Sequence, residues 1–125
     1  MVRLLGDIKC VVLDSNALLM PFQFGFNIDQ ELKRLFGDIP VVVPSAVLAE
    51  LANIEDKHAK AALALARRYP VVETDLRGDD GVIDVAVRTS AAVVTNDREL
   101  IRRLNERKIE VVRLRSRDHL ESNVY

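Results

Sequence analysis

Four acidic residues occupy comparable places in four separate segments of the chain. Asp14 follows the apolar run VVL, and Asp97 follows the apolar run AAVV and the polar pair TN. Asp80 lies in RGDDGVIDVAV at the start of a predicted helix, and Glu50 lies one turn inside the helix predicted after VVVP. In an open α/β sheet these places all open on the carboxyl edge of the strands, where ligands bind. Because crowded carboxylates repel one another unless a cation neutralises them, the four acids together predict a divalent metal site.

The donor atoms of this predicted site indicate the metal and the chemistry. A set of carboxylate oxygens favours Mg²⁺ or Mn²⁺, as one or two ions, whereas a zinc site of the Cys/His type would have only Cys10, His58 and His119 to draw on. Such sites most often act on phosphate esters, because the metal polarises the phosphoryl oxygens and lowers the pKa of bound water. The predicted reaction is therefore hydrolysis of a phosphate ester.

Each acid also has a purely structural interpretation. Asp14 could form an Asx-turn, and Asp80 and Asp97 are good N-caps whose charge suits a helix N-terminus. Glu50 could be a solvated carboxylate on a helix. The metal hypothesis therefore depends on the four acids meeting at one edge.

The elements that must position these acids alternate between short apolar runs and longer amphipathic stretches. The apolar runs lack a two-residue alternation, which is typical of strands buried on both faces. Strands are predicted at 10–14, 41–44, 71–74, 91–97 and 109–114. Helices are predicted at 27–37, 44–55, 56–69, 81–91 and 98–108. This order predicts a three-layer α/β/α fold, with a central parallel sheet of about five strands and right-handed crossovers.

The run LLMPFQFGF, residues 18–26, is read as a loop, and it is more apolar than a solvated connection should be. Its Met20, Phe22, Phe24 and Phe26 could pack under the first helices, cover a dimer contact, or stack on unpaired bases. Packing or a dimer contact is the favoured interpretation, because two tyrosines and no tryptophan argue against an extended stacking surface.

The composition is that of one ordinary globular domain. The 125 residues are 49% hydrophobic and 30% charged, and no apolar run approaches the ~20 residues of a membrane-spanning helix, so we expect a cytoplasmic protein with no membrane partner. The net charge of −1 is no global signature of nucleic-acid binding, although arginines gather late in the chain and could form a local basic stripe. These are Arg98, Arg102, Arg103, Arg107, Arg113, Arg115 and Arg117, joined by Arg67 and Arg68 in mid-chain.

The segments that carry the acids resemble those of a PIN domain, a metal-dependent nuclease fold. The resemblance runs through VVLDSNALL, VVVPSAVLAEL, DDGVIDVAV and VVTNDRELI, and it covers nearly the whole chain, 1–125, as a single PIN-like domain. It implies a Mg²⁺- or Mn²⁺-dependent endoribonuclease that hydrolyses RNA, with single-stranded or unpaired regions as substrate. Its catalytic and metal-binding acids would be Asp14, Glu50, Asp80 and Asp97.

The third acid has neighbours that compete with it for this role. Asp79 is adjacent, and Asp84 lies one turn further along the same helix face. Asp80 is chosen because its spacing to Ile83 matches the family pattern. Asp84 is then either a ligand of a second ion or an ion-pair partner of Arg88.

Four small polar residues would support the acids if the resemblance holds. Asn16 and Thr95 would orient carboxylates or water, and Ser15 and Asn96 complete the polar stretches in which they stand.

The resemblance leaves two branches of the family and one inactive alternative open. DDGVID and TNDRELIRRL favour the ribosomal-RNA-processing group, which would imply a ribosome-assembly partner. A VapC-type toxin ribonuclease, held inactive by an antitoxin, is the alternative, and a catalytically silent module that binds RNA or protein is the third hypothesis. PIN domains also imply a homodimer.

Overall fold

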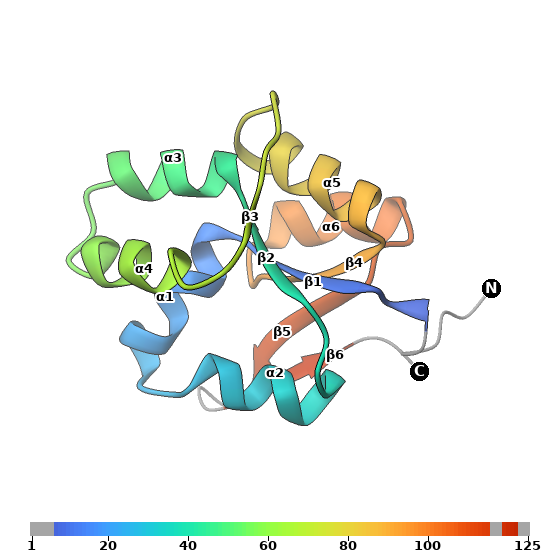
Figure 1. Ribbon diagram of the computed structural model, residues 1–125, viewed down its shortest axis with the longest axis horizontal. Coiled ribbons are helices and arrows are strands. Elements are labelled where there is room, and N and C mark those ends of the chain that lie inside the picture. The colour runs from blue at the N-terminus through green and yellow to red at the C-terminus, as the bar shows by residue number, and fades with distance from the viewer. Residues whose placement is uncertain (1–6, 116–118, 123–125) are drawn as a thin grey trace.

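The computed structural model describes residues 7–115 and 119–122, which form twelve helices and strands (Figure 1). In chain order the elements are β1 (Cys10–Leu13), α1 (Ser15–Phe24), α2 (Ile28–Phe36), β2 (Val41–Pro44), α3 (Ser45–Asn53), α4 (Ala59–Ala66), β3 (Val71–Val72), α5 (Gly78–Thr89), β4 (Ala91–Val94), α6 (Arg98–Glu106), β5 (Val111–Arg115) and β6 (His119–Ser122).

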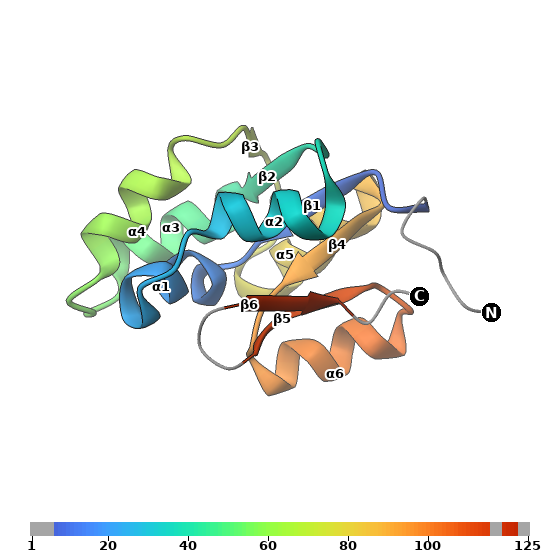
Figure 2. The same cartoon turned by 90° about the horizontal axis from the view of Figure 1, so that it is seen from below.

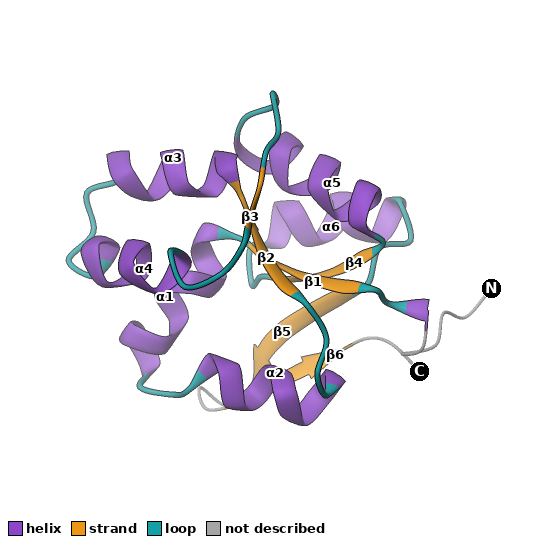
Figure 3. Ribbon diagram, in the orientation of Figure 1, coloured by secondary structure: helices purple, strands orange, loops and turns teal. Residues whose placement is uncertain are grey.

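These strands form one sheet in the order β3-β2-β1-β4-β5-β6. All neighbours are parallel except β6, which pairs antiparallel with β5. The strands lie in the middle of the molecule with helices around them (Figure 3), and α2 and α6 lie on opposite sides of the sheet (Figure 2). The predicted α/β fold with a central parallel sheet of about five strands is confirmed, and the sheet has β6 as an additional antiparallel strand.

The two central strands explain the continuous apolar runs of the sequence. Every residue of β1 and of β4 is buried, because neighbouring strands flank them on both sides and helices cover both faces of the sheet. Val12 pairs with Val93, and both are fully buried. The core therefore centres on the two strands that end next to Asp14 and Thr95.

The segment after β1 is a helix, so the prediction of a loop at 18–26 is wrong. In α1, Asp14 is the N-cap, and Gly25 at φ +71° ends the helix by donating its N–H to the carbonyl of Pro21. Pro21 lies in the second turn of this helix and lacks the N–H that would bond to the carbonyl of Ala17, so α1 continues past it with one ladder bond fewer.

The four apolar side chains of this segment divide between the core and the surface. Met20 is buried and Phe26 packs against the core, as the packing interpretation expected. Phe22 and Phe24 are exposed at the end of α1, with 39% and 43% of their surface accessible. The dimer contact and the base stacking stay predictions for these two side chains.

A sixth strand, β6, is absent from the sequence prediction because HLES is mostly polar. Leu120 alone is fully buried in it, and its neighbour on one side is β5. Its other edge is covered by α2: Glu31 accepts from the N–H of Leu120 at 2.9 Å, and Arg34 donates to its carbonyl at 2.8 Å. These side chains pair the backbone groups of an edge strand that would otherwise be open.

Candidate active site

The sheet has a switch point between β1 and β4. From β1 the chain passes through α1 and α2 to β2, and from β3 it crosses back through α5 to β4 on the other side of β1. Ligand sites in open α/β sheets lie beyond the carboxyl ends of the strands at such a point. Asp14 directly follows β1, and Thr95 directly follows β4. Two of the predicted site residues therefore stand side by side at this position.

Asp14 is a buried carboxylate, with 5% of its surface exposed. One oxygen accepts from the N–H of Ala17 at 2.7 Å, which is the N-cap bond of α1. Burial raises the pKa of Asp14 from 3.8 to about 7, and hydrogen bonds from Thr95 and Ala17 oppose the shift. The negative charges of Asp79 and Glu50 raise this pKa further. The ionised form of Asp14 thus lacks a compensating positive charge, which a bound cation would supply.

Thr95 connects two of the acids from a fully buried position. Its hydroxyl hydrogen-bonds the carboxylate of Asp14, and its Oγ1 accepts from the backbone N–H of Asp97 at 3.0 Å. Asp97 is itself the N-cap of α6, where its side chain accepts from the N–H of Leu100 at 2.9 Å. The N-cap interpretation is thus correct for Asp97 and wrong for Asp80, because α5 has Arg77 as its N-cap. Asp14, for which an Asx-turn was expected, is the N-cap of α1. The carboxylates of Asp14 and Asp97 each have a second oxygen outside the cap bond.

The two predicted asparagines hold the strand ends together. Asn16 Oδ1 accepts from the backbone N–H of Asn96 at 2.8 Å, which links the start of α1 to the end of β4. Asn96 Oδ1 in turn accepts from the N–H of Leu114 on β5 at 2.8 Å. Their contacts fit a structural role close to the acids. Ser15 is half-buried at the first position of α1, and within the described part of the chain its side chain hydrogen-bonds none of the four acids.

The two adjacent acids of α5 have different surroundings. Asp79 is half-buried, and its pKa is raised by burial first and then by the charges of Asp97, Glu50 and Asp80, while Arg103 lowers it. Asp79 is also the α5 acid that raises the pKa of Asp14.

Asp80, which the sequence analysis selected, is exposed and forms an ion pair with Arg103 of α6. Successive residues of a helix point about 100° apart, so only one of two adjacent acids can face the carboxyl edge. The geometry therefore argues against Asp80 and for Asp79 as the third acid.

Glu50 is exposed on α3, and its charge acts on both Asp14 and Asp79. The close packing of α3 on α5 brings it there. A Cβ built on Gly81 of α5 would lie 2.8 Å from the Cβ of Ala46 on α3 and 2.8 Å from the carbonyl of Leu76. A glycine at position 81 is thus what allows the two helices that carry Glu50 and Asp79 to approach.

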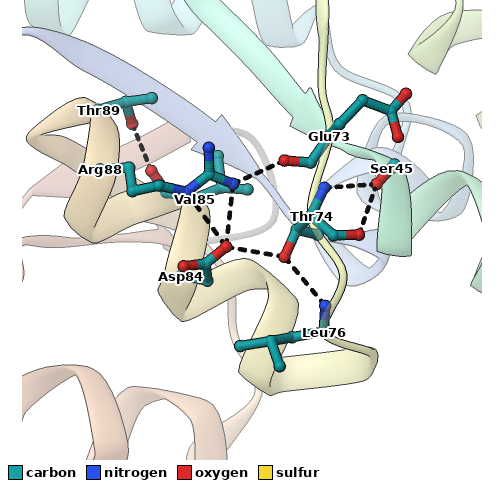
Figure 4. A network of polar contacts seen from close by, with 8 residues as sticks. All are labelled: Ser45, Glu73, Thr74, Leu76, Asp84, Val85, Arg88 and Thr89. Carbon is teal, nitrogen blue, oxygen red and sulfur yellow. Dashed lines mark hydrogen bonds and ion pairs between the residues drawn. The ribbon is translucent and has the colours of Figure 1, made fainter.

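Asp84 takes the structural role that the sequence left open for it, which argues against a second-ion ligand. Arg88 donates to Asp84 from Nε at 3.2 Å and from Nη2 at 2.9 Å, and the Thr74 hydroxyl donates to the same oxygen at 2.8 Å (Figure 4). These bonds, Arg88 first, lower the pKa of Asp84. Thr74 also donates its N–H to Ser45 at 2.9 Å (Figure 4). Through its hydrogen bond with Thr74, Asp84 therefore holds the segment that precedes α5 against α5.

The residues around Asp14 fit a divalent cation by the chemistry of their donors. Four carboxylates, at the N-caps of α1 and α6 and on α3 and α5, act on one another by charge, and all offer hard oxygen ligands. As they are placed, no three acidic, cysteine or histidine side chains of the described residues stand together as a ready metal-binding group. An ion would therefore have to draw these side chains together.

Fold and site define a class: an α/β domain with an acidic centre at the switch point of its sheet. A family model described as PIN like domain matches residues 11–117. The chain is 30% identical over 113 residues to Ribonuclease VapC9 of Archaeoglobus fulgidus, which covers 85% of this chain and 83% of that protein. It is 28% identical over 123 residues to Ribonuclease VapC4 of Methanocaldococcus jannaschii, at 89% of this chain and 94% of that protein.

A solved structure described as that of the PIN domain endonuclease Utp24 has the same fold. It superposes with a TM-score of 0.82 over 97% of this chain and 96% of that one, at 20% identity. The chain belongs to the PIN-like domain family, which confirms the resemblance noted from its motifs. No helix of the described residues is both long and apolar enough to cross a membrane.

Proposed function

We propose that this protein is a divalent-metal-dependent endoribonuclease that hydrolyses phosphodiester bonds of RNA in single-stranded or unpaired regions. The observation that carries the proposal is the buried carboxylate of Asp14 at the switch point, surrounded by the charges of further acids. Two similar proteins are ribonucleases by name, and a nuclease of the same family shares the fold.

The proposed metal-binding acids are Asp14, Glu50, Asp79 and Asp97, with Asp79 in place of Asp80. A bound Mg²⁺ or Mn²⁺, as one or two ions, supplies polarisation of the scissile phosphate and a lowered pKa for the attacking water. Thr95 orients Asp14 and the backbone of Asp97. Burial raises the pKa of Asp14 to about 7, so about half of this side chain is protonated at neutral pH without a cation, and a bound cation would favour its ionised form.

A cleavage assay tests this function. An unpaired RNA and a hairpin RNA are incubated with the protein in Mn²⁺, Mg²⁺ or EDTA, beside Asp14→Asn. Asp38→Asn is the matched control, because Asp38 is an exposed acid that pairs with Lys33 at the end of α2. We expect cleavage of the unpaired RNA that needs metal and is lost in Asp14→Asn alone. Cleavage that survives both EDTA and Asp14→Asn contradicts the proposal, and RNA binding without cleavage supports the silent module.

Two cellular roles fit this activity. Processing of RNA, including ribosomal RNA with a ribosome-assembly partner, follows from the motifs DDGVID and TNDRELIRRL. A toxin ribonuclease with an antitoxin partner is the second candidate, favoured by the two similar proteins named VapC. Growth arrest on expression of the wild type but not of Asp14→Asn supports the toxin role, and unaffected growth supports processing.

The exposed end of α1 offers a surface for the proposed homodimer. Phe22 and Phe24 lie there with 39% and 43% of their surface accessible. Light scattering of the wild type and of a Phe22→Ser, Phe24→Ser variant measures whether these side chains hold two copies together. A dimer that persists in the variant argues against this surface.

A further inference from the structure

Arg103 is a basic residue placed beside the acidic cluster. It lies in the second turn of α6, and its guanidinium forms an ion pair with Asp80 at the start of α5. Its charge also acts on Asp79, the neighbouring acid of that helix turn. The arginine-rich late part of the chain thus places one of its members against the rim of the site.

The adjacent Arg102 has a different environment on the same helix. It forms ion pairs with Glu99 and Glu106 of α6 itself, one turn away on either side. The side chain of Arg102 is 56% exposed, whereas that of Arg103 is 27% exposed. Arg102 is therefore a solvated residue within its own helix, while Arg103 is held between α6 and α5.

An acidic site that cleaves RNA must also overcome its own repulsion of the phosphate backbone. The four carboxylates at this edge act on one another by charge, and repulsion between like charges opposes the approach of an anionic strand. An arginine suits the task of holding a phosphate, because its planar guanidinium binds phosphate oxygens in pairs. Arg103 lies where such a contact is needed.

We propose that Arg103 binds a phosphate group of the RNA backbone next to the acidic cluster, and that Asp80 holds its guanidinium in position until RNA arrives. Asp80 is 62% exposed, so the pair lies open to solvent on the Asp80 side, and a phosphate can replace the carboxylate. The assignment rests on the proposed ribonuclease function. It gives Asp80 a role outside the metal site.

Equilibrium binding in EDTA tests this role without cleavage or metal. A fluorescently labelled, unpaired 12-nucleotide RNA is titrated with the full chain, and anisotropy is recorded over a range of KCl concentrations. Arg103→Gln is compared with Arg102→Gln, a matched loss of one positive charge from the same helix. Arg103→Lys keeps the charge but cannot form a paired contact, and thermal unfolding shows that each variant is folded.

For Arg103→Gln we expect binding weaker by roughly ten-fold, as for loss of a charged hydrogen bond. The slope of log K against log salt should become shallower by about 0.7, the value for one phosphate of a single strand. The affinity of Arg103→Lys for the RNA should lie between those of Arg103→Gln and the wild type. Arg102→Gln should match the wild type in affinity and in salt slope. If Arg103→Gln acted only by displacing Asp79, the slope of log K against log salt would keep its wild-type value.

Equal affinity and slope for Arg103→Gln and Arg102→Gln, in a protein that binds RNA, overturns the assignment of Arg103 and leaves the proposed function standing. No binding of the RNA by any of the proteins, together with no cleavage in metal, overturns both.

Discussion

Replacing Asp14 by asparagine separates the stability of this fold from its function. Asparagine has nearly the same shape and is an equally good N-cap, so the bond from the N–H of Ala17 to the side chain at position 14 is retained. What the substitution removes is the charge of a carboxylate that is 5% exposed and surrounded by further acids. Without metal, the variant should therefore be more stable than the wild type at neutral pH.

The magnitude follows from the pKa of Asp14, which is raised from 3.8 to about 7 in the folded protein. Between these two values the folded state holds a proton that the unfolded state has released, so the free energy of unfolding falls as the pH rises. About three pKa units correspond to about 4 kcal/mol. This contribution of the Asp14 proton to the free energy of unfolding is fully present below pH 3.8 and is lost by the time the pH passes about 7.

Urea unfolding in EDTA at several pH values measures this effect. The difference in free energy of unfolding between Asp14→Asn and the wild type should grow in favour of the variant by about 3 kcal/mol from pH 5 to pH 8. Millimolar Mn²⁺ should then stabilise the wild type and not the variant, since a ligand selective for the native state raises its stability. A difference that stays constant with pH would refute the account of Asp14 as a buried, uncompensated acid.

Four further substitutions test the rest of the site. Asp79→Asn should abolish the rise in thermal stability on adding Mn²⁺ while Asp80→Asn keeps it, and the opposite result would restore Asp80 as the third acid. Gly81→Ala should lower the free energy of unfolding by about 1–3 kcal/mol and slow cleavage, because its Cβ would lie 2.8 Å from a side chain of α3; an unchanged urea midpoint contradicts this packing. Thr95→Val removes a hydrogen bond that lowers the pKa of Asp14, so the stabilisation by Mn²⁺ should need a higher pH than in the wild type; an unshifted pH profile argues against the hydrogen bond.

The predictions that succeeded from sequence rest on local patterns. The runs CVVL and AAVV are apolar throughout because both faces of their strands are covered, and this showed where β1 and β4 end. Asp14 and Thr95 follow directly, so their meeting at the carboxyl edge was foreseeable. The predicted loop at 18–26 failed because Asp14 caps a helix that begins directly after β1 and continues to Phe24.

The predictions that failed depend on contacts between segments far apart in the chain. The polar HLES forms β6 because α2 pairs its outer edge through Glu31 and Arg34. Nothing in residues 119–122 alone signals that partner.

By itself, the sequence determined the class of fold and predicted four segments that carry acids to one edge of the sheet, because buried strands, strand ends and helices can be recognised from the pattern of neighbouring residues. The tertiary structure decided which residues of those segments meet. The choice between Asp79 and Asp80 depends on how α5 is rotated about its axis, and the packing around Gly81 against α3 sets that rotation. The place of Arg103 likewise depends on how α6 packs beside α5. Such rotations result from contacts across the whole domain, so no single stretch of the chain specifies them.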